Sequence, residues 1–166
     1  MNRLPLAALL STMSISLVGC HSGSSTTRPA ADYRGHKAEQ AVAQKEFSNA
    51  FDAYTRAVSA DDPTLLFSML SDQVEFWSPG GVWAGPEGRQ KLIDTLNEHT
   101  RAGCRIKITL LTSTYSGDTA VYEFKAEGDV MIGGQKQPYK GQNALLIRIS
   151  GGKITALHGY QGQKSA

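Results

Sequence analysis

The chain has 166 residues, with 17 Lys and Arg against 15 Asp and Glu and a formal net charge of +2. Nucleic-acid binding needs a basic stripe that neutralises phosphates, and this near-neutral balance without any block of like charges argues against such a partner. Cys20, Cys104 and the four histidines show no spacing typical of zinc ligands, so we expect neither a metal nor a cofactor.

The N-terminal segment has the pattern of a secretion signal. An apolar run, Leu4–Val18, has the length of a signal-peptide core and is short for a membrane span. Leu17, Gly19 and Cys20 at its end resemble a bacterial lipobox, whose cysteine is acylated on sulfur before cleavage. The resemblance implies that residues 1–19 are removed and that lipidated Cys20 attaches the mature protein to a membrane. The alternatives are an ordinary secretory peptide or a short buried helix.

Residues 20–37 are expected to form a flexible tether to one domain at 38–166. The tether is rich in Ser, Thr, Gly and Pro and has few large apolar side chains to offset chain entropy. His21, in place of an aspartate, resembles the default that sends lipoproteins to the outer membrane. The expected location is therefore the cell envelope, on the outer membrane facing the periplasm if the cell is Gram-negative. Cys104 is then the remaining thiol, either a small buried hydrophobe or a nucleophile.

Three helices are expected in the first half of the domain. An apolar stripe at helical spacing predicts a helix from about Ala38 to Ala60. Asp61-Asp62-Pro63 supplies a cap and a proline for a short second helix, and Gly85-Pro86 opens a third. The stripe of the first helix consists of Phe47, Ala50, Phe51, Tyr54, Ala57 and Val58, and the buried side of the third consists of Leu92, Ile93 and Leu96.

Strands are expected to follow. Val74–Ser78 reads as a strand ended by Pro79-Gly80-Gly81, and alternating apolar residues predict strands near 106–110, 120–126, 145–149 and 154–160. In the last of these, Ile154, Ala156, His158 and Tyr160 are expected to share one face. Helices first and strands last predict an α+β domain in which a bent antiparallel sheet wraps around a helical layer.

Three local motifs in this order resemble the nuclear transport factor 2-like superfamily, which includes ketosteroid isomerase and the SnoaL-like polyketide cyclases. The resemblance covers about residues 44–162 and implies a cone-shaped fold, with a curved antiparallel sheet around N-terminal helices and an apolar pocket between them. The motifs are Tyr54-x-x-Ala57-Val58-x-Ala60-Asp61-Asp62, Leu70-Ser71-Asp72-x-Val74-Glu75-Phe76 and Gly85-x-Glu87.

The resemblance does not extend to the residues of the isomerase reaction. In ketosteroid isomerase a tyrosine and a protonated aspartic acid form the oxyanion hole, and a second aspartate moves the proton. Aligned residue by residue, Tyr54 falls on the tyrosine, but Ser78 falls on the base and Leu145 on the second acid. Neither can do those tasks, so we expect no steroid isomerase activity. A shift of the alignment brings Asn143, a competent donor, onto the same strand face as Leu145.

The expected pocket draws on the first helix, the strands and the loop near Trp83. If the protein is an enzyme, His158 is the candidate base and Tyr54 the acid. The alternatives are a core tyrosine, exposed strand residues and a tryptophan that only anchors packing. The expected lining is Tyr54, Phe76, Ser78, Trp83, Tyr122, Asn143, Leu145, His158 and Tyr160.

Three functions remain open on this basis. The first is an envelope-anchored domain that binds a small apolar ligand or a partner protein. The second is a cofactor-free isomerase, dehydratase or cyclase of the SnoaL-like type. The third is a structural module that forms a homodimer through its sheet face. The absence of the isomerase carboxylates favours the first.

Overall fold

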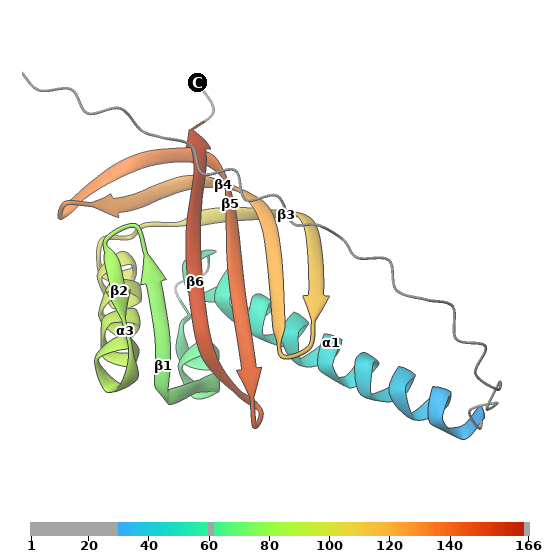
Figure 1. The fold of residues 1–166 in the computed structure, drawn as a ribbon. Helices are drawn as coiled ribbons and strands as arrows, with labels where there is room; N and C mark the ends of the chain where they lie inside the picture. The colour runs from blue at the N-terminus through green and yellow to red at the C-terminus, as the bar shows by residue number, and fades with distance from the viewer. Residues whose placement is uncertain (1–29, 60–61, 165–166) are drawn as a thin grey trace, which may run out of the picture.

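A computed structural model describes residues 30–59 and 62–164 of the chain (Figure 1). The predicted signal peptide, Cys20 and residues 20–29 of the predicted tether lie outside the described residues. Among those described, no helix is long and apolar enough to cross a membrane.

The first helix, α1 (Ala30–Ser59), buries the apolar stripe that its sequence predicts. Phe47, Phe51 and Val58 are at most 7% exposed, and the alanines between them are buried as well. The helix begins at Ala30 and not near Ala38, so the last part of the predicted tether, 30–37, is helical. This extension contains Ala30, Ala31, Arg34 and Lys37, which have high helix propensity.

Two shorter helices complete the helical layer. α2 (Thr64–Met69) buries Leu66, and α3 (Gly85–Arg101) has Pro86 in its first turn and buries Leu92 and Leu96. Ile93 is only half-buried, although its spacing predicted a core position. Figure 1 shows α3 beside β1 and β2 and α1 running beneath the long strands.

The strands form one six-stranded sheet in the order β2-β1-β6-β5-β4-β3. Neighbours are antiparallel except β1 and β6, which pair in parallel. This differs from the purely antiparallel sheet expected, while the α+β class and the curved sheet are confirmed. The strands are β1 (Leu70–Ser78), β2 (Gly81–Trp83), β3 (Ile106–Ser116), β4 (Thr119–Ile132), β5 (Gln135–Ser150) and β6 (Lys153–Lys164).

A glycine lies where β4 meets the start of β3. Gly128 has a φ of 154°, and a Cβ atom there would lie 1.9 Å from the carbonyl oxygen of Arg105. The next residue, Asp129, donates its N–H to that oxygen at 3.1 Å. Only glycine fits so close an approach. Beyond this point β4 and β5 continue as a ribbon that bends across the top of the molecule in Figure 1.

A β-bulge in β6 changes which side chains face the core. Arg148 pairs with Ala156, but the next residue, Ile149, pairs with Ile154, which leaves Thr155 as the extra residue. Because one inserted residue reverses the alternation, Ile154 and Leu157 both point inward. Ala156 and His158 lie on the outer face. The prediction that Ile154 and His158 share a face is therefore wrong.

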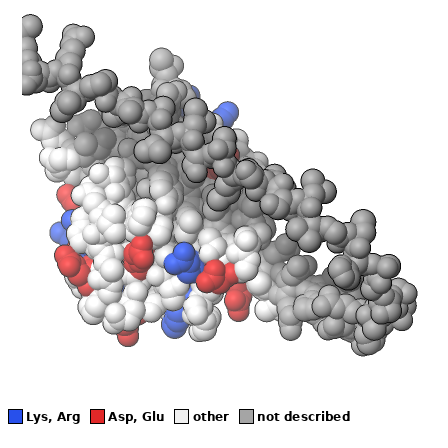
Figure 2. Space-filling model, in the orientation of Figure 1, with Lys and Arg blue, Asp and Glu red and all other residues white. Residues whose placement is uncertain are grey.

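The core lies between the concave face of the sheet and α1. Phe51 stacks on Tyr122 of β4, with ring centroids 4.1 Å apart, and Ile147 and Ile154 are fully buried beside them. On the face that Figure 2 shows, acidic and basic side chains of the described residues are interspersed and form no patch of one sign.

Candidate functional site

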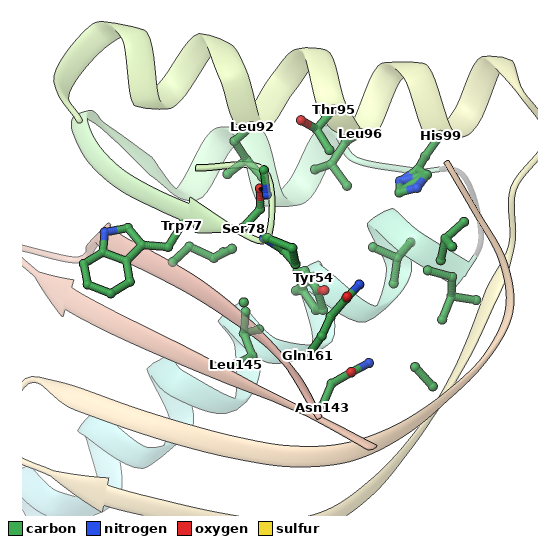
Figure 3. Close-up of a pocket in the computed structure, with 18 of the residues that line it drawn as sticks. Tyr54, Trp77, Ser78, Leu92, Thr95, Leu96, His99, Asn143, Leu145 and Gln161 are labelled. Carbon is green, nitrogen blue, oxygen red and sulfur yellow. Dashed lines mark hydrogen bonds between the residues drawn. The ribbon is translucent and has the colours of Figure 1, made fainter. Parts of the chain in front are cut away.

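A cavity of about 570 Å³ opens between the sheet and α3 (Figure 3). Its volume falls within the roughly 300–1,000 Å³ of small-molecule sites. Its walls come from α1, α3 and all six strands of the sheet. Apolar side chains of the lining include Val58, Phe76, Trp83, Leu92, Leu96, Phe124, Leu145 and Leu157.

Most of the residues predicted from the sequence line this cavity. Figure 3 shows Tyr54, Ser78, Asn143 and Leu145 around it, with the residues of α3 across from the strands. The predicted residues found in the lining are Tyr54, Phe76, Ser78, Trp83, Asn143, Leu145 and Tyr160.

Two predicted residues lie elsewhere. Tyr122 is 2% exposed and belongs to the core, where it stacks on Phe51 and does not reach the cavity. His158 lies on the outer face of the sheet, because the bulge at Thr155 reverses the alternation of β6. Its Nε2 lies 3.1 Å from Oε1 of Glu75. The structure therefore does not bring His158 and Tyr54 together as a base and an acid.

The polar side of the cavity is built on alternate residues of β5. Tyr139, Gly141 and Asn143 point to the same face, and the hydroxyl of Tyr139 donates to Oδ1 of Asn143 at 2.5 Å. A Cβ atom on Gly141 would lie 2.5 Å from the Tyr139 hydroxyl oxygen. Gly141 thus leaves the space through which Tyr139 reaches Asn143. Tyr139 and Gly141 were missed by the sequence analysis, although their alternate spacing would have placed them on the same strand face as Asn143.

Tyr54 reaches the same cavity from α1. Burial raises its pKa to about 12, and the nearby Tyr139 adds to that increase. The hydroxyl therefore keeps its proton at neutral pH and is available as a donor. Because Oδ1 of Asn143 already accepts from Tyr139, its amide N–H groups remain for another acceptor. Tyr54 and Asn143, which come from different elements, thus both present donors to the cavity, whose lining also includes the polar side chains of Ser78, Thr95 and Gln161 (Figure 3).

The α3 wall contributes a histidine that the sequence analysis left without a role. Nε2 of His99 accepts the backbone N–H of Met131 at 3.0 Å, which ties the end of α3 to β4. Burial lowers the pKa of His99. The imidazole is therefore neutral at neutral pH, and the nitrogen that would act as a base is already used as an acceptor.

The mouth of the cavity carries one lysine and one tryptophan. Nζ of Lys91 lies 5.2 Å from the centre of the Trp83 ring, a cation–π distance. Among the described residues that line the cavity there is no Asp or Glu. Across the described part of the chain, no three His, Cys, Asp or Glu side chains gather as a metal site would require.

The chain belongs to the SnoaL-like domain family, whose model matches residues 51–157. Three solved structures illustrate the likeness. An NTF2-like protein from Anabaena variabilis is 26% identical with a TM-score of 0.59, over 73% of this chain and 90% of that one. A protein from Xanthomonas campestris described as a polyketide cyclase is 17% identical with a TM-score of 0.60, over 72% and 93%.

The third is an LEH-like epoxide hydrolase from M. tuberculosis, 15% identical with a TM-score of 0.56, over 71% of this chain and 84% of that one. The last two are similar in fold alone. No curated protein matches the chain. The nuclear transport factor 2-like fold is thereby confirmed.

Proposed function

We propose that this SnoaL-like domain binds a small apolar molecule in its cavity and holds a carbonyl or hydroxyl oxygen of that molecule between Tyr54 and Asn143. The observation that carries the proposal is a cavity of about 570 Å³ whose walls are mainly apolar and which contains two convergent donors. A few fixed polar groups in an apolar pocket orient a ligand, while the apolar walls supply most of the affinity.

The test uses the lipid-free chain, residues 21–166, with Nile red as a neutral fluorescent probe. Cyclohexyl phenyl ketone and its hydrocarbon analogue benzylcyclohexane would compete for the cavity. Each Tyr54→Phe or Asn143→Leu change removes one hydrogen bond, so we expect about fivefold weaker binding of the ketone. Binding of the hydrocarbon should be unchanged.

Tyr115→Phe serves as the control, because Tyr115 is half-buried and lies outside the cavity lining. Its affinities should equal those of the wild type. Absence of saturable Nile red binding would overturn the proposal. Equal losses for the ketone and the hydrocarbon would refute the role of the two donors.

A second candidate is a cofactor-free isomerase, dehydratase or cyclase. It is favoured by membership of the SnoaL-like family and by the position of the Tyr54 hydroxyl in the cavity, where it can donate to a developing oxyanion. The described lining supplies no carboxylate base, and Nε2 of His99 is engaged. We therefore rank this candidate below ligand binding.

We further propose that the domain works at the cell envelope, held by lipidated Cys20, and that two copies pair through the outer face of the sheet. Support for the first statement is the lipobox-like Leu17-Val18-Gly19-Cys20. Support for the second is the aromatic group of Trp77, His158 and Tyr160, in which Tyr160 is 44% exposed, although Trp77 and Tyr160 also border the cavity. Sedimentation of the lipid-free chain measures its oligomeric state directly, and a monomer at all concentrations would refute the pairing.

A further inference from the structure

The described cavity lining carries charge of one sign only, which is positive. Five described residues of the lining are ionisable, and three of them are tyrosines. Of the other two, His99 is neutral at neutral pH because burial lowers its pKa. Lys91 is therefore the one charged side chain in the described lining.

The Trp83 ring, held in place by its neighbours, positions the side chain of Lys91 at the rim of the cavity. The Trp83 ring under its ammonium packs near Phe76, with centroids 5.8 Å apart, and lies against Gly81. A Cβ atom on Gly81, whose φ is 149°, would lie 3.0 Å from that ring. The indole is thus fixed by a core residue on one side and by a glycine on the other. It holds the Lys91 ammonium at the mouth by a cation–π contact.

The ammonium has no carboxylate to neutralise it. Within the described residues Lys91 forms no ion pair, although Glu87 and Asp94 each lie about one turn from it on α3; Asp94 accepts a hydrogen bond from Gln90 at 2.9 Å. The ammonium therefore remains available to an anion at the opening of the cavity. A cation at such a mouth favours an anion on the ligand over a neutral or cationic group.

From this arrangement we infer that the cavity selects apolar carboxylic acids, with the carboxylate at the Lys91–Trp83 rim and the hydrocarbon part between α3 and the sheet. The inference rests on the proposed function, since it requires that the cavity binds apolar molecules. It adds the charge of the ligand and its direction of entry. The tail enters first, and the anionic end stays in partial contact with water, so the carboxylate is not fully desolvated.

The experiment compares decanoate, decanol and decylamine as competitors of Nile red on the lipid-free chain. All three share one tail and differ in the charge of the head. Because Lys91 is exposed, we expect decanoate to bind about fivefold more tightly than decanol. Decylamine should bind more weakly than decanol, and added salt should reduce both differences.

Three variants locate the effect. Lys91→Met keeps the length of the side chain and removes its charge, so decanoate and decanol should then bind equally, while Lys91→Arg should retain the preference. Lys125→Met, an exposed lysine of β4 outside the cavity lining, should behave as the wild type.

Equal affinities of decanoate and decanol in the wild type, with both competing, would overturn this inference and leave the proposed function standing. A preference for decanoate that survives in Lys91→Met would overturn it too. If none of the three compounds competes and Nile red itself does not bind, it is the proposed function that fails.

Discussion

The imidazole of His158 lies flat on the indole of Trp77, with ring centroids 4.2 Å apart and an interplanar angle of 10°. The two residues are direct partners in the parallel pairing of β1 and β6. His158 is 6% exposed, and its Nε2 faces Oε1 of Glu75. His158 is therefore a packed, titratable residue of the outer face of the sheet and lies outside the cavity lining.

The pH dependence of stability follows from that packing. Burial and, to a smaller extent, Arg148 lower the pKa of His158 below 6.5, while Glu75 opposes the shift. Below the unfolded value of 6.5 the unfolded chain binds the proton more readily, so stability is lost as pH falls through that value. His99 contributes with the same sign. Urea midpoints should therefore fall from about pH 7.5 to about pH 5.5.

His158→Phe provides the control, because it preserves the stack on Trp77 and removes the titration. The variant should lose less stability over the same pH range than the wild type. A loss as large as that of the wild type would mean that His158 does not carry this part of the pH dependence.

The face of α1 that packs on the sheet can be tested by truncation. Phe51 stacks on Tyr122 and contacts Phe124, with centroids 5.9 Å apart. Phe51→Ala should lower the free energy of unfolding by about 3–5 kcal/mol through lost burial and a cavity. Asn49→Ala, on the exposed face of the same helix, should change it by less than about 0.5 kcal/mol. Equal urea midpoints for the two variants would contradict the packing described.

The hydrogen bond across Gly141 predicts a specific binding defect. In Gly141→Ala the new methyl group would meet the Tyr139 hydroxyl, which must then leave Asn143. We expect weaker binding of cyclohexyl phenyl ketone with the fold retained by circular dichroism, and a similar loss in Tyr139→Phe. If both variants bind the ketone as tightly as the wild type, the orientation of Asn143 does not depend on Tyr139.

Membrane attachment is predicted to depend on Cys20, which lies outside the described residues. Cys20→Ala should move the protein from the detergent phase to the aqueous phase in a partitioning assay, without a change in the urea midpoint of the domain. A variant that still partitions with detergent and carries acyl chains would refute the lipobox interpretation.

Steroid isomerase activity is predicted to be absent. The position of the base holds Ser78, which lines the cavity but has no basic partner among the described residues there, and Leu145 cannot donate a proton. Isomerisation of a model 3-ketosteroid should therefore proceed at the buffer rate. Turnover that disappears in Tyr54→Phe would instead support the enzyme hypothesis.

The sequence pattern predicts the parts of this fold whose periodicity is uninterrupted. The stripe through Phe47 and Phe51 and the alternation in β4 are found as expected, because each depends on local spacing. The side on which His158 lies could not be predicted. The bulge at Thr155 involves no glycine or proline, and a single inserted residue reverses every following side chain.

The residues that line the cavity were likewise predicted only in part. Tyr54 and Asn143 were expected in it, whereas the link from Tyr139 to Asn143 depends on a contact along one strand that only the three-dimensional path of the side chain reveals. Lys91 was missed because an exposed lysine on a helix has no distinguishing pattern. Its importance comes from the lack of acidic residues around it in the folded, described lining.

The place of β6 between β1 and β5 also determines when the domain can fold. The last strand of the chain joins two parts of the sheet, so β1 and β2 have no long partner until the C-terminal residues are available. Contacts of such large sequence separation slow folding. A nascent chain truncated after Ser150 would contain three helices and five strands but would lack the strand that joins β1 and β2 to β5. The six-stranded sheet can therefore be completed only after residues 153–164 have been synthesised.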